Sequence, residues 1–268
     1  MGTLSGIIKD HIIWRKQLFK LAKSDIIKTY SGSALGWAWA LIKPAIYIFI
    51  CWFVFQIGLK VSRGPEGYPY VMWLMAGIMP WFFMEEMITQ GMESFKAYSY
   101  LVTKMKFPVA TIPTFVGISH FIIHFGIIIL LTIIYLMYGY IPDIFFLQLP
   151  LYMVLMFAFF VNWALFSALL GALSQDFINL INSFTVAIFW LSGIFFDVRG
   201  MENPVIKTLL LFNPVTFVIE GYRDVFIYKV WIWERPQSIA GYLVMLTIMV
   251  ASATWAYKKL YREIPDVL

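Results

Sequence analysis

Long apolar stretches recur along the chain, and shorter polar segments separate them. Six of these stretches approach or exceed the roughly 20 residues that a helix needs to cross about 30 Å of hydrocarbon. Because the bilayer core offers backbone N–H and C=O groups no partner, each crossing must be a closed helix. The expected spans are residues 35–59, 70–90, 110–138, 149–173, 178–196 and 238–257. The pattern therefore predicts an all-α membrane protein, in which residues 35–268 form one domain with six transmembrane helices.

Residues 1–34 lack the long apolar core of a span or of a cleavable signal. At 100° per residue, a helix over residues 7–29 has lysines on one face. Its opposite face is apolar and carries Ile7, Trp14, Leu18, Leu21 and Ala22. This pattern is typical of a cytoplasmic helix at the membrane interface; a helix packed on a soluble partner is the alternative. Ser31-Gly32-Ser33 should end this helix and turn the chain into the bilayer.

The segment between the fifth and sixth spans has two apolar stretches that are too short to cross. They are Ile206–Phe212 and Val215–Ile219, and the turn-forming pairs Asn203-Pro204 and Asn213-Pro214 precede them. Such backbone is tolerated at membrane depth where it is buried in protein or lines a cavity. We expect a pair of short re-entrant helices, with a plain amphipathic external loop as the alternative.

The composition excludes a soluble protein. Hydrophobic residues make up 61% of the 268 residues and charged residues 13%, whereas soluble domains carry about 25% charge. The net charge is +5, yet no Lys/Arg-rich block resembles a nucleic-acid arm, so nucleic acid is not an expected partner. Cys51 is the only cysteine and should be a small packing residue.

Lysine and arginine are distributed unequally between the two sides of the predicted spans. Twelve of them lie in the N-terminal segment, the 91–109 loop and the C-terminal tail, and two lie in the short loops 60–69 and 139–148. The positive-inside rule therefore places both termini in the cytoplasm of a multi-pass protein.

The sequence offers little for catalysis. It contains no Gly-Lys-Ser or Gly-Lys-Thr, so it should not bind ATP, and we expect no cofactor and no enzyme activity from this chain alone. His120 and His124 have i, i+4 spacing, but without a carboxylate, cysteine or third histidine nearby they indicate a packed, hydrogen-bonded pair and no metal site. A membrane-embedded enzyme is therefore the weaker class.

Charged residues inside the predicted spans are better candidates for function, because such charges are costly and tend to be functional. Lys43 in the first span and Glu85 and Glu86 in the second should lie at similar depths, since the two spans form an antiparallel hairpin. We expect Lys43 to face one of the glutamates or a polar conduit; snorkelling to the interface is the alternative. Trp39 and Tyr47 share its helix face and could line the same conduit, or could be belt or core aromatics.

The 91–109 loop is too mixed for lipid and too apolar for a free linker. It predicts a short cytoplasmic helix whose exposed apolar and basic side chains contact a partner. The residues concerned are Phe95, Lys96, Tyr98, Leu101, Lys104, Met105, Lys106 and Phe107.

Five motifs, taken together and in this order, resemble the ABC-2 type permeases of polysaccharide exporters. They are Tyr30–Gly36 with Trp39 and Pro44; Gly77–Phe83; Leu101–Pro108; Asn213-Pro214 with Tyr222-Arg223; and the tail from Tyr261 to Leu268. Each motif is weak alone, but the resemblance covers nearly the whole chain. Within that family, Gly67–Tyr70 and the Lys104–Val109 segment are most similar to the teichoic-acid branch.

The resemblance implies a homodimer of this chain with two copies of a separate ABC ATPase, which would hold ATP and Mg. It implies a lipid-pyrophosphate-linked glycan as cargo, such as teichoic acid, O-antigen or capsule, and a place in the bacterial cytoplasmic membrane. Lys28 and Lys43 could meet the diphosphate at the cytoplasmic entrance. An ATP-independent transporter or channel is a further alternative, which internal repeats would favour.

Overall fold

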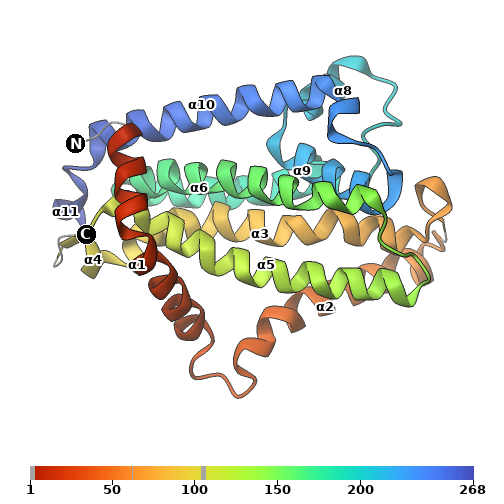
Figure 1. The fold of residues 1–268 in the computed structure, drawn as a ribbon, viewed down its shortest axis with the longest axis horizontal. Helices are drawn as coiled ribbons and strands as arrows, with labels where there is room; N and C mark the ends of the chain where they lie inside the picture. Colours follow the sequence, from red (N-terminus) through yellow and green to blue (C-terminus); the bar gives the residue numbers. More distant parts are fainter. Residues whose placement is uncertain (1–3, 62, 104–106) are drawn as a thin grey trace.

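The computed structural model describes residues 4–61, 63–103 and 107–268. Long helices lie side by side in one bundle, and both termini lie at the same end of it, which we call the terminal end (Figure 1). Five helical segments of the described chain are long and apolar enough to cross a membrane. They are Gly36–Gly58 (η1 Gly36–Ala38, α2 Trp39–Trp52 and the π-helix η2 Phe53–Gly58), α3 (Tyr70–Ala97), Val109–Met137 (η4 Val109–Thr111 and α5 Ile112–Met137), Ile144–Leu173 (η5 Ile144–Gln148 and α6 Leu149–Leu173) and α10 (Pro236–Leu260). All five coincide with predicted spans, and the all-α fold is confirmed for the described residues.

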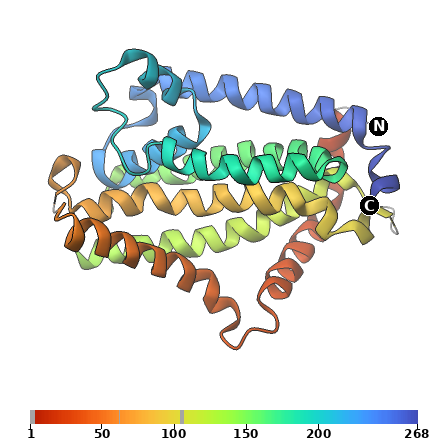
Figure 2. The ribbon, with the colours of Figure 1, turned by 180° about the vertical axis from the view of Figure 1, so that it is seen from behind.

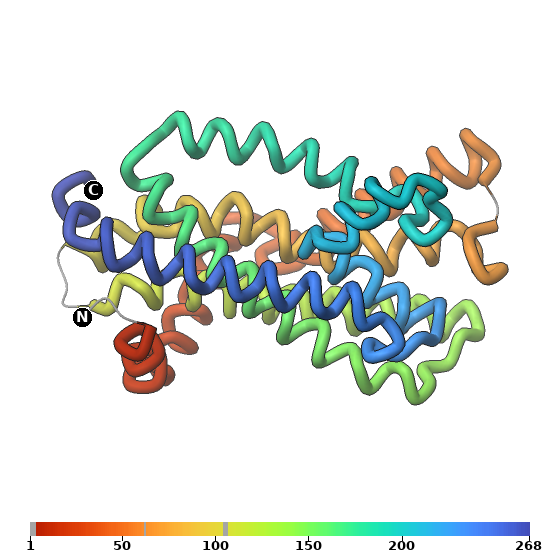
Figure 3. Tube along the Cα trace, turned by 90° about the horizontal axis from the view of Figure 1, so that it is seen from above, coloured from red at the N-terminus to blue at the C-terminus, as the bar shows by residue number. Residues whose placement is uncertain are grey.

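The fifth predicted span, residues 178–196, differs from the helix observed there. α7 (Gln175–Leu191) has 17 residues, which is the lower limit for a crossing helix. It begins early because the Ser174 side chain accepts a hydrogen bond from the Phe177 N–H at 3.2 Å, as an N-cap does. It ends early because the chain turns at Gly193, whose φ is +79°. α7 nevertheless runs along the bundle beside the other long helices (Figures 2 and 3).

α3 is the central helix of the bundle. In its most apolar window 83% of the residues are buried, against 11% in the Gly36–Gly58 segment at the periphery. Glycine allows α3 and α6 to pack closely, since a Cβ on Gly91 would lie 2.8 Å from the Cβ of Ala164. Small residues at helix contacts are the usual device of membrane bundles. α3 is therefore enclosed by other helices, while α2 keeps a broad apolar face that the described residues leave uncovered.

α1 (Leu4–Tyr30) forms the predicted N-terminal helix and ends at the predicted break, where Gly32 has φ +88°. Its predicted apolar face packs on the bundle: Ile7, Leu18 and Ala22 are buried. These residues of the face therefore contact the bundle, chiefly α5 and η4. His11 Nε2 and Thr114 Oγ1 are 2.7 Å apart, which ties α1 to α5. The placement of α1 at a membrane surface stays a prediction.

Two short helices follow α7, close to the two that were predicted. α8 (Pro204–Leu211) and α9 (Pro214–Arg223) meet at 89°. An Asn-Pro pair explains where each of the two helices begins. Each asparagine side chain accepts at least one hydrogen bond from a backbone N–H of the first turn, and proline suits the first helical position. No residue of α8 is buried, whereas nine of the ten residues of α9 are, so α9 inserts into the bundle and α8 lies outside it. Re-entry of the pair into a membrane leaflet remains a prediction.

The remaining described helices are short. They are η3 (Pro65–Gly67), α4 (Ser99–Thr103), the π-helix η6 (Asp224–Tyr228), η7 (Ile232–Glu234) and α11 (Ile264–Val267). α4 and α11 lie with α1 at the terminal end (Figure 1). There, buried apolar residues of α1, α3, α4, α5, α6, α10 and α11 form what we call the terminal cluster, which is separate from the main core around α3.

Candidate functional site

A cavity of about 320 Å³ lies between the start of α2, the second half of α3 and the first half of α5. We call it the charged cavity. Its polar lining residues are Tyr30, Lys43, Tyr47, Glu85, Glu86, Thr89, His120 and His124. Pro44, inside α2, cannot donate a hydrogen bond to the carbonyl of Ala40, and both residues line the cavity. The wall on the α2 side is thus more polar than the sequence of an apolar span suggests.

Lys43 shares this cavity with both glutamates, as the sequence predicted for a polar conduit. Its charge interacts electrostatically with Glu86, whose carboxylate also accepts a hydrogen bond from the Gln90 side chain. Within the described residues, Lys43 forms no ion pair at 4.0 Å or less. Two carboxylates and one ammonium group therefore face a space in which none of them is locked into a salt bridge.

Trp39, predicted for the conduit, and Lys28, predicted for the diphosphate entrance, do not line the charged cavity. Trp39 is partly buried at the start of α2, outside the lining. Lys28 lies over the ring of Tyr98, with its Nζ 4.8 Å from the ring centroid. Conversely, the sequence interpretation missed Tyr30 and His120. The available signals were the position of Tyr30 directly before the helix break and the position of His120 one turn from His124.

His124 connects the charged cavity to α9. Its ring is buried, and its Nε2 lies 2.7 Å from the hydroxyl of Tyr222, which is fully buried as well. The histidine therefore hydrogen-bonds to a tyrosine rather than forming a pair with His120. Among the described residues, no group of three or more His, Cys, Asp or Glu side chains is placed to hold a metal ion.

The 91–107 segment differs from its predicted form. α3 continues to Ala97, and α4 follows after one residue. The predicted exposure was wrong for four residues, which are buried in the terminal cluster: Phe95, Tyr98, Leu101 and Phe107. The reason is tertiary, because residues of several helices distant in sequence pack around them. Trp14 of α1, for example, packs edge-on against Phe107, with the ring centroids 5.2 Å apart.

Tyr98 shows how tightly α1 holds this segment. Its hydroxyl donates to the carboxylate of Asp25, which also accepts from Ser119. Burial, and then the hydrogen bond to Asp25, raise the pKa of the Tyr98 phenol. Lys96 is exposed, and its Nζ lies 3.0 Å from Oε1 of Gln175. The predicted contact residues Lys104, Met105 and Lys106 lie outside the described residues.

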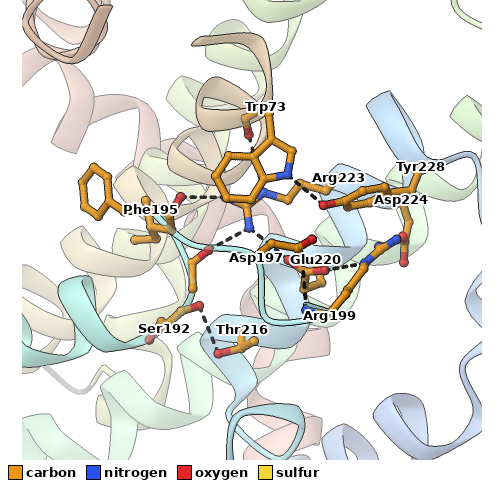
Figure 4. A network of polar contacts seen from close by, with 12 residues as sticks. Trp73, Ser192, Phe195, Asp197, Arg199, Thr216, Glu220, Arg223, Asp224 and Tyr228 are labelled. Carbon is orange, nitrogen blue, oxygen red and sulfur yellow. Dashed lines mark hydrogen bonds and ion pairs between the residues drawn. The ribbon is translucent and has the colours of Figure 1, made fainter. Parts of the chain in front are cut away.

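Arg223 anchors α9 beside Trp73 of α3 (Figure 4). Its side chain is fully buried, and its guanidinium lies 3.4 Å from the ring centroid of Trp73. It donates to the carbonyls of Gly193 at 2.7 Å and Ile194 at 2.6 Å, and it pairs with Glu220 at 2.9 Å. A buried charge needs this full set of partners. Arg223 therefore joins α9 to α3 and to the turn after α7.

The same network extends toward α10. Arg199 pairs with Glu220 at 2.8 Å and with Asp224, and Arg235 pairs with Asp224 at 2.9 Å. Gly77 on α3 leaves the space that the network needs, because a Cβ there would lie 2.7 Å from Nη2 of Arg223. Of the external residues predicted from sequence, Asn213 and Pro214 begin α9, Tyr222 contacts His124, and Arg223 anchors the helix.

The described chain is thus a bundle of helices able to cross a membrane, with a polar cavity between three of them. The chain belongs to the ABC-2 type transporter family, whose model matches residues 16–227. It is 18% identical over 258 residues to the O-antigen export system permease protein RfbA of Myxococcus xanthus, covering 96% of this chain and 95% of that protein. It is 22% identical over 251 residues to the protein of the same name from Klebsiella pneumoniae, covering 92% of this chain and 94% of that protein.

Proposed function

We propose that this chain is the permease subunit of an ABC transporter that exports a lipid-pyrophosphate-linked polysaccharide across the bacterial cytoplasmic membrane. The observation that carries the proposal is the charged cavity, which holds unpaired charges inside a bundle of apolar helices. Intramembrane charge of this kind marks a substrate path. The relatives, named as O-antigen export permeases and matched over nearly their full length, support a glycan as cargo.

Each side chain of the charged cavity has a role in this proposal. The ammonium group of Lys43 attracts the diphosphate of the cargo, since a lysine binds phosphate as a point charge. Glu85 and Glu86 accept hydrogen bonds from sugar hydroxyls, and Tyr30 and Tyr47 offer ring surface and hydroxyl groups. The lipid tail of the cargo stays in the bilayer.

The proposed assembly is a homodimer with two copies of a separate ABC ATPase. The nearly unburied face of α2 and η2 supports a second copy as its partner: Phe49 and Ile50 of α2 and Phe53 of η2 are more than half exposed. At the terminal end, the ATPase would contact the exposed face of the 93–103 segment, which carries Lys96 and Tyr100. ATP and Mg would bind to the ATPase, whose closure would shift the bundle between states.

For the cargo we propose wall teichoic acid, on the similarity of residues 67–70 and 104–109 to that branch of the family. O-antigen or capsular polysaccharide is the second candidate, and the names of the matched relatives favour it. Depleting the protein in its host and measuring surface glycans separates the two. The glycan that disappears from the surface, while its lipid-linked precursor accumulates inside, is the cargo. Unchanged surface glycans and precursors after depletion would overturn the proposed function.

A further inference from the structure

A second cavity, of about 190 Å³, lies at the end of the bundle opposite the termini. Tyr68, the end of α5 with the turn after it, and the π-helix η6 with Lys229 line it, and α5 ends at that side of the bundle (Figure 1). We call it the aromatic cavity. It shares no lining residue with the charged cavity. It is smaller than the roughly 300 Å³ at which drug-sized sites begin, so it suits a single ring.

Five of its eleven lining residues are aromatic. Tyr68 and Tyr140 are stacked with ring centroids 4.4 Å apart, and they bring together two loops that are distant in sequence. The ring centroid of Phe226 lies 4.9 Å from that of Tyr135 and 5.3 Å from that of Phe146. The face of an aromatic ring carries partial negative charge and attracts the positive edges of C–H groups. The wall therefore suits a ligand with an apolar C–H face.

Two charged residues of the cavity lining form an ion pair. Asp143 and Lys229 are 3.0 Å apart, with side chains 39% and 28% exposed, so both keep contact with solvent. The Lys229 backbone has φ +55°, a left-handed conformation that glycine adopts at lower cost. The Nζ of Lys229 also donates to the Val225 carbonyl at 3.1 Å. A lysine is thus held in a strained conformation with its charge fixed at an aromatic wall, which is typical of functional sites.

The hydroxyl of Tyr68 adds a donor to this set. Burial, followed by the neighbouring Tyr140 and Asp143, raises the pKa of the Tyr68 phenol, which therefore keeps its proton at neutral pH. The cavity then offers a carboxylate acceptor, an ammonium donor and a phenol beside stacked rings. Charge-assisted hydrogen bonds of this kind fix the orientation of a polar ligand.

We propose that the aromatic cavity binds one pyranose ring of a glycan. A pyranose has apolar C–H faces for the aromatic rings and hydroxyl groups at its rim for Asp143 and Lys229. A cationic ligand fits less well, although aromatic cages often bind cations, because Lys229 already supplies a positive charge at the cavity. The inference goes beyond the proposed function, since ring binding requires neither ATP nor an ATPase.

The test uses the full-length protein in lipid nanodiscs and methyl glycosides of hexoses and N-acetylhexosamines, with saturation-transfer NMR titrations. We expect saturable binding of at least one glycoside by the wild type. Tyr140→Ala and Asp143→Asn should each weaken it about tenfold, since they remove a ring or a charged hydrogen bond. Asparagine is chosen at 143 because it can still cap η5, where Asp143 accepts from the Phe145 N–H at 3.1 Å.

Two variants outside the cavity lining serve as matched controls. Tyr138 is 57% exposed and does not line the cavity, so Tyr138→Ala should bind like the wild type. Glu202 is exposed and distant in sequence, so Glu202→Gln controls for the loss of one carboxylate. The proposal is overturned if the wild type binds no glycoside saturably, if Tyr140→Ala and Asp143→Asn bind as tightly as the wild type, or if tetramethylammonium binds in place of the glycosides.

A second measurement identifies the source of the ring. Reduced glycan export by Tyr140→Ala in cells assigns the ring to the cargo, and unchanged export with lost glycoside binding assigns it to another glycan outside the membrane. Both outcomes support a sugar-binding site in the aromatic cavity and differ only in the source of the ring. If depletion of the protein leaves all surface glycans unchanged, the proposed function fails, while the nanodisc titration still decides the sugar site independently.

Discussion

At the scale of single residues, one close fit on α3 is between a glycine and an arginine. Gly77 is required because the Arg223 guanidinium occupies the space where a side chain would begin. The guanidinium is fully buried between two backbone carbonyls, a carboxylate and an indole ring, so it cannot move away without losing these contacts. A methyl group at this position must therefore displace part of the network.

We expect Gly77→Ala to lower the stability of the bundle by about 1–3 kcal/mol, the usual cost of overpacking. The measurement is the thermal unfolding midpoint in detergent or nanodiscs. Gly126→Ala on α5 is the matched control, because nothing lies within 4 Å of a Cβ there. The control should be neutral or slightly stabilising, since alanine favours helix. Equal midpoints for both variants and the wild type would contradict the assigned role of Gly77.

Lys43 gives a second prediction at this scale. Lys43→Ala should reduce glycan export about tenfold or more, since a charged hydrogen bond contributes roughly 1.5–3 kcal/mol. The unfolding midpoint should stay unchanged, because Lys43 has an exposed side chain. Lys20→Ala, an exposed lysine on α1, is the control. If Lys43→Met combined with Glu86→Gln restores export, Lys43 is a structural partner of Glu86 and not a cargo contact.

At the scale of elements, hydropathy was enough to place most helices, but not to decide what covers them. The apolar lengths predicted five of the long helices because membrane burial acts on each segment independently. The burial of Phe95 and Leu101 could not be predicted in this way, since residues of several helices distant in sequence form the cluster around them. The same holds for the charged cavity: its glutamates were identifiable as intramembrane charges, whereas Tyr30 joins them only through the turn between α1 and α2.

The 93–103 segment allows burial and partner contact to be tested separately. Leu101 is 3% exposed, so Leu101→Asp should lower the unfolding midpoint of the isolated chain. Its neighbour Tyr100 is 46% exposed, so Tyr100→Asp should leave the midpoint unchanged but weaken co-purification with the ATPase. Normal assembly and ATPase activity of the Tyr100→Asp complex would rule out this face as the contact.

At the scale of the whole molecule, the prediction that a separate ABC ATPase subunit hydrolyses the ATP can be tested. The chain lacks a P-loop sequence, so the purified protein should show no ATP hydrolysis, and activity should appear when the ABC ATPase is added. A malachite-green phosphate assay on both preparations measures this. Hydrolysis by the chain alone, after removal of contaminating ATPases, would refute the assignment.

The hydrogen bond between His124 and Tyr222 has a mechanical consequence. His124 belongs to the wall of the charged cavity, and Tyr222 directly precedes Arg223 on α9. Both side chains are buried, so neither finds water to replace a lost partner, and breaking the bond costs roughly 1–3 kcal/mol. Displacing His124 from the wall of the charged cavity would therefore also deprive a residue of α9 of its hydrogen-bond partner. The charged cavity and the Arg223 network are thus joined by one buried hydrogen bond next to Arg223.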